Sequence, residues 1–222
     1  MDLTIFLINL DCNIYIIGIT YQKLEFTVNP ANYFISGKVT HTFTAITNMN
    51  TVTFDLYKKT VSPFTITSVK MNGSNLVFSY LSTHELVITL PSTLISENSA
   101  TVEIIYSGAP TTSPSDKGFF TGTHSGSPVL WTLSEPFGAR TWWPCKNDLN
   151  DKVDVTDIYI TAPVAYSSVA NGVEPQGFGY PLIVGGNKTS YFKHNYPIPS
   201  YLYHLIFENT VKCFCIEFIS CN

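Results

Sequence analysis

The chain has 222 residues, of which 45% are hydrophobic and 13% are charged, and its net charge is −4. This composition can supply a sizeable core, and it excludes an intrinsically disordered chain, which would need the opposite balance. There is no run of five or more basic residues, so neither nucleic acid nor an anionic membrane is expected as a partner.

The first segment of the chain, residues 1–19, is apolar but does not have the pattern of a targeting signal. Asp2 and Asp11 interrupt it, and no positively charged region precedes it. Its longest uncharged run, residues 12–22, is about half the length that a membrane span requires, so no span is expected. The Thr-, Ser- and Asn-rich composition is compatible with an extracytoplasmic location, but no leader supports it.

Short alternating segments predict β-strands along most of the chain. In residues 35–45, Ile35, Val39, Phe43 and Ala45 would face the core, and the Ser, Thr and Lys between them would face water. Asn72-Gly73 is expected to form a hairpin turn. Further strands are expected at residues 52–56, 65–71, 76–81, 86–90 (ending at Pro91), 102–106, 153–162, 166–173, 188–195 and 201–208.

The connections between these segments carry turn residues, and no segment has sustained helical periodicity. Residues 109–118 are typical of a long surface loop, and residues 135–147 of a tryptophan-rich turn. The sequence therefore predicts one all-β domain, an antiparallel β-sandwich, over residues 21–208. Residues 1–20 and 209–222 are left unassigned.

The cysteines do not form a disulfide framework in a chain of this size. Cys12 and Cys145 are isolated, whereas Cys213, Cys215 and Cys221 crowd the last ten residues. Their spacing differs from that of a zinc knuckle and no matching pair lies upstream, so ordinary thiols are the favoured interpretation.

The histidines offer two candidate metal sites, both incomplete. His84-Glu85 begins a sequence close to H-E-x-x-H, but Ile88 replaces the second histidine and the segment alternates like a strand, so we favour an exposed strand start. His194 and His204 flank a proline-containing turn and could meet across a hairpin, which would give at most two ligands. No G-x-S-x-G, phosphate-loop or dinucleotide motif is present.

The most distinctive segment is residues 132–148, Thr-Leu-Ser-Glu-Pro-Phe-Gly-Ala-Arg-Thr-Trp-Trp-Pro-Cys-Lys-Asn-Asp. Glu135, just after a predicted strand, could present a carboxylate to a cation while Arg140 balances its charge. The alternative is a surface ion pair between Glu135 and Arg140, which residue chemistry alone favours.

Here the sequence resembles the aminopeptidase N family of zinc exopeptidases (gluzincins). The family carries a segment like T-Q-x-E-P-x-x-A-R-x-x-x-P-C-x-D, matched here by Thr132, Leu133, Glu135, Pro136, Ala139, Arg140, Pro144 and Cys145. Residues 191–202 are similar to its aromatic-x-x-x-x-Y-P-I-x-x-Y-L run, and residues 21–26 and 35–39 to its opening segment. Order and spacing agree over residues 21–205.

The resemblance implies a saddle-shaped β-sandwich that packs over a separate thermolysin-like catalytic domain, and peptide N-termini as the substrate. It also implies that Glu135 binds the substrate's free α-ammonium, as an exopeptidase requires. Leu133 replaces the family's Gln, which puts one substrate contact in doubt, and Asn147 replaces its Asp.

The family's G-x-M-E-N strand and H-E-x-x-H helix do not occur in this sequence. We therefore expect zinc only in a full-length family enzyme, no cofactor in this chain, and no hydrolysis by the chain alone. A longer aminopeptidase truncated by a frameshift or a mispredicted gene boundary would explain the unfamiliar residues 1–18 and 206–222. The alternative is a true stand-alone gene.

Two other functions remain open: a stand-alone β-sandwich that binds peptide ends or glycans, and a structural domain of a larger surface protein. A binding module would more often carry aromatic residues on one exposed strand face. Tyr159, Tyr166 and Tyr180 are expected to be too dispersed for that, so the aminopeptidase domain is the preferred function.

Overall fold

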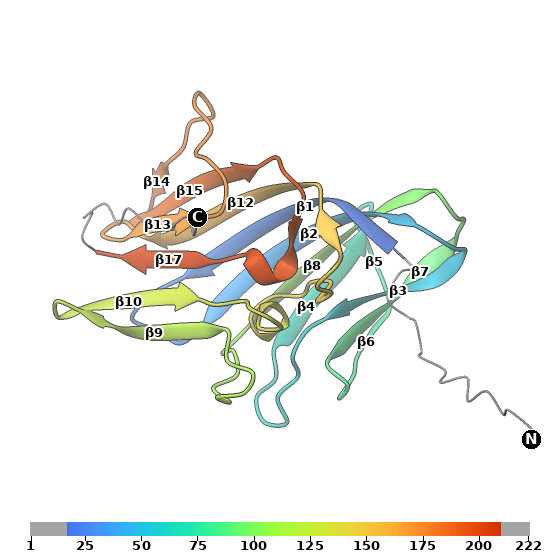
Figure 1. The fold of residues 1–222 in the computed structure, drawn as a ribbon, viewed down its shortest axis with the longest axis horizontal. Helices are drawn as coiled ribbons and strands as arrows, with labels where there is room; N and C mark the ends of the chain where they lie inside the picture. The colour runs from blue at the N-terminus through green and yellow to red at the C-terminus, as the bar shows by residue number, and fades with distance from the viewer. Residues whose placement is uncertain (1–16, 210–222) are drawn as a thin grey trace, which may run out of the picture.

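An eight-stranded sheet is the largest element of the molecule, for which a computed structural model describes residues 17–209 (Figure 1). Its strands lie in the order β14 (Leu182–Val184), β15 (Asn187–His194), β12 (Val155–Pro163), β1 (Ile17–Val28), β2 (Ile35–Ala45), β8 (Ser99–Gly108), β4 (Thr65–Met71) and β5 (Ser74–Asn75). All neighbours pair antiparallel except β1 and β12, which pair parallel from Tyr21↔Val155 to Thr27↔Thr161.

Three smaller sheets accompany the large one. The four-stranded sheet has the order β13 (Ser167–Ala170), β17 (Leu205–Glu208), β10 (Ser127–Thr132) and β9 (Phe119–His124). The three-stranded sheet has the order β3 (Met49–Asp55), β7 (Glu85–Leu94) and β6 (Phe78–Tyr80), and β11 (Lys152–Val153) pairs with β16 (Ile198–Pro199). The 3-10 helices η2 (Ala139–Thr141) and η3 (Ser200–Leu202) lie in connections.

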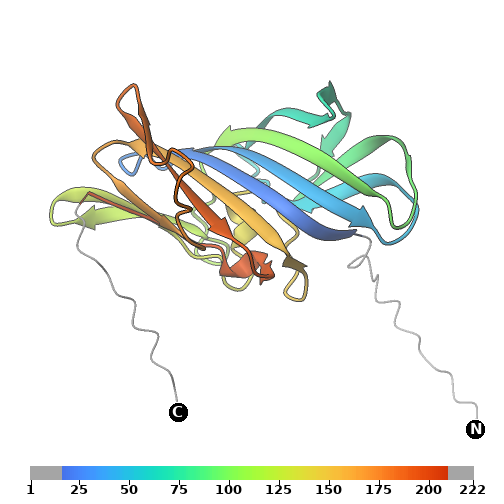
Figure 2. The same ribbon diagram turned by 90° about the horizontal axis from the view of Figure 1, so that it is seen from above.

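Two hydrophobic clusters fill the space under the large sheet. The first joins it to the four-stranded sheet through residues such as Phe26, Leu130 and Phe207, and the second joins it to the three-stranded sheet through residues such as Phe43 and Phe54. Figure 2 shows the long strands as one curved layer, with the four-stranded sheet below it. The architecture confirms the predicted all-β sandwich.

Alternation decides which side of each strand is buried. In β2 every odd-numbered residue from Ile35 to Ala45 is buried, and the Ser, Lys and Thr residues between them are partly exposed. The same pattern in β1, β8 and β12 gives the large sheet one apolar inner face and one polar outer face. Among the described residues, no helix has the length and apolarity needed to cross a membrane.

Three predicted strand details are wrong. Pro91 does not end its strand, since β7 continues to Leu94. β6 pairs with β7 only as far as Ile88, so β6 does not require a backbone N–H from residue 91. The turn at Asn72-Gly73 forms, but it leads only into the two-residue β5, and β6 joins another sheet. Tyr201 lies in η3 and not in a strand.

Candidate functional site

The segment that carries Glu135, residues 132–148, follows β10 and is fastened to the sandwich on both sides of the glutamate. The Leu205 N–H donates to Thr132 Oγ1 at 2.8 Å, and the Leu133 N–H donates to the Gly118 carbonyl at 3.0 Å. Ser134 Oγ donates to the Tyr203 carbonyl at 2.7 Å. These bonds fix the backbone immediately before Glu135.

A tight turn carries Glu135 away from the core. The Gly138 N–H donates to the Ser134 carbonyl at 2.7 Å, and η2 follows directly. A Cβ on Gly138 would lie 2.5 Å from the Leu133 carbonyl oxygen, so the turn closes only with glycine at this position. The Glu135-Pro136 peptide bond within the turn is cis.

The two adjacent tryptophans anchor the far side of the turn in the core. Trp142 and Trp143 are fully buried; Trp142 packs on Phe26 with ring centroids 5.3 Å apart, and Trp143 packs edge-on against Tyr203 at 5.7 Å. Trp142 Nε1 also donates to Ser134 Oγ at 3.3 Å. The tryptophans therefore support the turn, and neither is placed to contact a ligand.

Glu135 itself is exposed at the tip of the turn. The expected ion pair with Arg140 does not form, and no ion pair within residues 17–209 involves Glu135. Arg140 acts instead on the buried carboxyl of Asp55: burial raises the pKa of Asp55, and the Asn147 N–H and the Arg140 charge oppose that rise. The Glu135 carboxylate is thus left without a cation from the described chain.

The end of the segment joins β3. Cys145 and Asp55 exchange backbone hydrogen bonds of 2.7 and 3.0 Å, and the Asn147 N–H donates to Asp55 Oδ2 at 3.0 Å. Cys145 is buried as a free thiol, and burial raises its pKa, which makes it a core residue and not a nucleophile. The backbone N–H of Asn147 thus caps Asp55.

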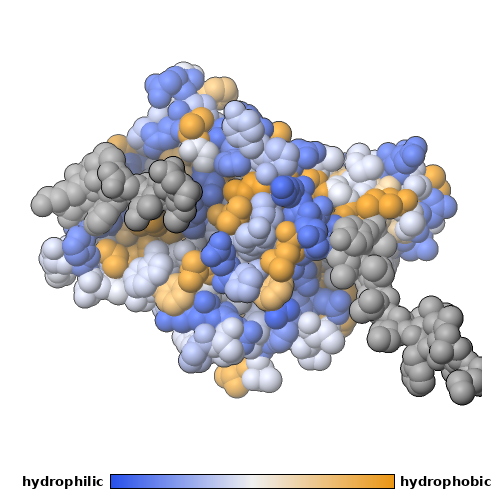
Figure 3. All heavy atoms as spheres, viewed as in Figure 1, coloured by the Kyte–Doolittle hydropathy of each residue, from blue (hydrophilic) through white to orange (hydrophobic). Residues whose placement is uncertain are grey.

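Exposed apolar residues precede and follow Glu135 in the chain. Leu133 and Phe137 flank it and are 51% and 50% exposed. On the outer face of the four-stranded sheet, directly paired residues form what we call the apolar row: Val169, Ile206, Trp131 and Phe120. Figure 3, in the same view as Figure 1, shows hydrophobic residues interspersed with hydrophilic ones on the face where this sheet lies. Glu135 therefore follows a strand, β10, whose outer side carries part of this row.

Neither candidate histidine site belongs to a group of three or more metal-binding side chains within residues 17–209. His84 precedes the strand β7 and stacks on Tyr57 at 4.2 Å, and Ile88 is buried in the core, so the two positions cannot share a metal. The Nδ1 atoms of His194 and His204 lie 2.9 and 3.3 Å from the nearby carbonyl oxygens of Tyr196 and Leu202.

Residues 17–209 contain no group of three or more His, Cys, Asp or Glu side chains that could hold a metal ion. The described residues therefore do not fit a zinc site. Cys12, Cys213, Cys215 and Cys221 lie outside the described residues.

The expectation that the tyrosines are dispersed is wrong for two of the three. Tyr159 and Tyr180 lie 5.5 Å apart, and both contact Tyr191, whereas Tyr166 is buried in the core. The sequence signal was present in part, because Tyr159 and Tyr191 each occupy an outward position of a predicted strand. Their adjacency depends on the pairing of β12 with β15, which the alternation does not reveal.

Two of three comparisons with known proteins find similar proteins. The model of the peptidase M1 N-terminal domain matches residues 19–202. The crystal structure of an M1 zinc metallopeptidase from Deinococcus radiodurans superposes with a TM-score of 0.73 at 25% identity, covering 86% of this chain and 42% of that one. Leukotriene A4 hydrolase from Saccharomyces cerevisiae superposes with a TM-score of 0.67 at 19% identity, covering 87% and 29%. A search of curated proteins finds no match.

Proposed function

Because the chain belongs to the peptidase M1 family through its N-terminal domain, we propose that it is the substrate-gating domain of a zinc-dependent aminopeptidase. In this proposal Glu135 binds the α-ammonium of a peptide, and a thermolysin-like catalytic domain, absent from the described residues, supplies the zinc. The chain spans 42% of the Deinococcus metallopeptidase, so the activity belongs to a longer assembly.

The observation that carries the proposal is the exposed and unpaired carboxylate of Glu135 on a rigidly held turn. A carboxylate that pairs with a substrate cation needs a fixed position and must not be neutralised by a neighbouring base. Hydrogen bonds from Ser134 and Leu133 fix the turn, and Arg140 acts on Asp55 instead. A peptide has its ammonium only at its N-terminus, so such a contact selects chain ends.

Exposed apolar residues before and after Glu135 support a neighbouring domain. Interfaces between domains of one chain bury about 600–1,500 Å² and include apolar contacts. Leu133 and Phe137, each two residues from Glu135, and the apolar row on the sheet that contains β10 provide exposed apolar side chains. A domain packed there would bring its substrate cleft to Glu135.

A chimera tests this role. We would fuse the chain to the catalytic domain of the Deinococcus enzyme, a relative solved in complex with the substrate Tyr-Ser-Ala, and measure KM for that tripeptide. Glu135→Gln should raise KM by roughly 10- to 100-fold, because a hydrogen bond between charged groups contributes about 1.5–3 kcal/mol. The inhibition constant of N-acetyl-Tyr-Ser-Ala should change little, because it has no ammonium.

Glu174→Gln is the matched control, since Glu174 is also an exposed carboxylate but lies in the loop before β14. It should leave both constants unchanged. Equal weakening of the free and the acetylated peptide by Glu135→Gln would remove the assigned role. The 222-residue chain alone, supplied with zinc, should not hydrolyse Tyr-Ser-Ala.

A further inference from the structure

The outer face of the eight-stranded sheet carries a continuous row of hydroxyl groups. Directly paired residues on six neighbouring strands are all Ser or Thr, and we call them the hydroxyl row: Thr189, Thr161, Thr27, Ser36, Ser107 and Thr65. Neighbouring strands lie about 4.8 Å apart, so the row presents hydroxyls at regular intervals across the sheet. Within the described chain, the hydroxyls of Thr27, Ser36 and Ser107 have no hydrogen-bond partner, whereas Thr161 and Thr189 bond to each other at 2.8 Å.

A groove of about 580 Å³ runs over this row. Five of the six hydroxyl-row residues line it, together with Tyr159, Tyr180 and Leu182 at one end. Its volume falls within the range of ligand sites, about 300–1,000 Å³. The separate cavity behind the loop before β14, lined by Glu174, Gln176 and Ser190, has about 40 Å³ and is too small for an organic ligand.

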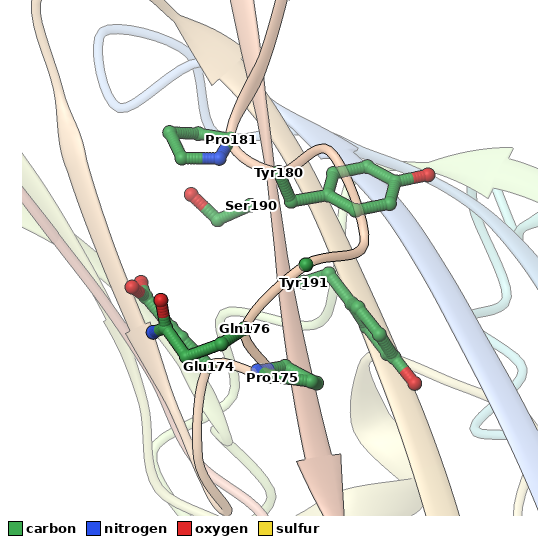
Figure 4. A pocket seen from close by; sticks show the side chains of 8 residues that line it. Glu174, Pro175, Gln176, Tyr180, Pro181, Ser190 and Tyr191 are labelled. Carbon is green, nitrogen blue, oxygen red and sulfur yellow. The ribbon is translucent and has the colours of Figure 1, made fainter.

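Two aromatic side chains form a platform at that end of the groove. Phe178 and Tyr180, which we call the aromatic platform, are 64% and 37% exposed. Tyr180 packs at 65° on Tyr159 and at 63° on Tyr191, both at 5.5 Å, and Phe178 packs edge-on against Tyr191 at 5.9 Å. In Figure 4 the rings of Tyr180 and Tyr191 project to one side of the loop, away from Glu174 and Gln176.

The base beneath the platform is held rigidly. Tyr159 and Tyr191 stack in parallel with centroids 4.5 Å apart, and the Tyr191 hydroxyl donates to Asp157 Oδ1 at 2.8 Å. Asp157 also accepts from Tyr21 at 2.8 Å and from Lys193 at 3.0 Å. Burial alone would raise the pKa of Asp157, but these hydrogen bonds lower it, so the carboxylate stays charged and keeps the tyrosine in place.

The lining of the groove has no net charge. Its two charged residues, Glu25 and Lys38, pair with each other at 2.9 Å. A charged ligand would find no complementary field there, and an apolar peptide would leave the hydroxyl row without partners. A neutral molecule with many hydroxyls and flat C–H faces satisfies both the row and the platform. We propose that this face binds a neutral oligosaccharide, with a sugar ring stacked on Tyr180 and its hydroxyls bonded along the hydroxyl row.

Calorimetry on the 222-residue chain tests the site with five neutral probes: the hexaoses of the cellulose, laminarin, mannan, xylan and chitin series. At least one should bind at millimolar concentration, with an affinity that added salt does not change, because a neutral ligand releases no counterions. Tyr180→Ala should weaken that binding at least about tenfold through the lost stacking. Thr27→Val should weaken it by about threefold or more through the lost hydroxyl.

Thr51→Val is the matched control, since Thr51 is exposed on β3, outside the groove, and circular dichroism verifies that each variant folds. The proposal is overturned if none of the hexaoses binds. It is also overturned if binding survives both Tyr180→Ala and Thr27→Val, or if high salt removes it. These outcomes are independent of the Glu135 chimera, because Glu135 does not line the groove.

Discussion

The outer face of the four-stranded sheet and the outer face of the eight-stranded sheet lie on opposite sides of the sandwich. The first carries Val169, Ile206, Trp131 and Phe120 in its central row, and the second carries Ser and Thr in the hydroxyl row. Both rows occupy the outward positions of alternating strands. The difference therefore lies in what each face is expected to meet, a protein domain or a hydroxyl-rich ligand.

The two faces also differ in how their projecting groups are held. The turn of Glu135 depends on side chains in the core, because Trp142 bonds to Ser134 and packs on Phe26. The aromatic platform depends on surface contacts, because Phe178 and Tyr180 rest on Tyr191 and Tyr159 from outside. A core change should therefore disturb the first face far more than a surface change disturbs the second.

Trp142→Ala measures how strongly the turn of Glu135 depends on the core, and it has the largest effect that we expect. It should lower the free energy of unfolding by about 3–5 kcal/mol, because it removes a fully buried aromatic ring and leaves a cavity. Phe178→Ala, at the opposite face, should change it by no more than about 0.5 kcal/mol. Urea unfolding followed by circular dichroism gives both values. Comparable losses of unfolding free energy in the two variants would show that the aromatic platform stabilises the fold as much as the tryptophan behind the turn does.

The pH dependence tests a second core contact of the Glu135 segment. His41 is fully buried, and burial lowers its pKa from 6.5 to about 4 although its Nε2 lies 3.0 Å from the Pro144 carbonyl oxygen. The unfolded chain therefore takes up a proton at a higher pH than the folded chain does. The stability due to neutral His41 is complete above pH 6.5 and decreases as the pH falls towards 4, by about 3 kcal/mol in total.

Urea titrations at neutral pH and near pH 4 measure this loss. His41→Gln should be less stable than the parent at neutral pH but should lose about 3 kcal/mol less between the two conditions. His194→Gln, which removes a histidine bonded only to its own loop, should keep the parental dependence. An unchanged pH dependence in His41→Gln would mean that His41 has the same pKa in the folded and the unfolded chain.

The alternation of apolar and polar residues is sufficient to predict the fold class, because each long strand has one buried and one exposed side. Residues 35–45 illustrate this, since every predicted core position of β2 is buried. The sequence also predicts the turn around Glu135, through the tryptophan-rich segment 135–147. That Arg140 does not pair with Glu135 could not be predicted, because it depends on Asp55, which β3 brings to the end of the segment.

The hydroxyl row and the aromatic platform could not be predicted. The individual Ser and Thr residues are visible in the sequence, but the row exists only through the register of six strands. One of these pairings, Thr27 with Thr161, is parallel and joins strands distant in the chain. Tyr180 belongs to a loop with no periodicity, and only the position of that loop beside β15 brings it onto Tyr191.

The smallest expected effect concerns association. If a catalytic domain normally covers the apolar row, the isolated chain should self-associate through it, because exposed apolar patches mark interaction sites. Val169 is 52% exposed on β13, an edge strand that pairs only with β17. Val169→Lys places a charge in the row, and a lysine on an edge strand opposes pairing with another chain. It should weaken self-association by about tenfold, or about 1.4 kcal/mol.

Light scattering over a concentration series measures the effect. Val61→Lys is the matched control, because Val61 is 77% exposed in the loop between β3 and β4 and belongs to neither row. It changes the net charge by the same amount, so a general effect of charge on solubility would appear equally in both variants. A parent chain that is monomeric at tens of micromolar would contradict the idea that a catalytic domain normally covers the apolar row. Equal association of the parent chain and the Val169→Lys variant would place the contact elsewhere on the molecule.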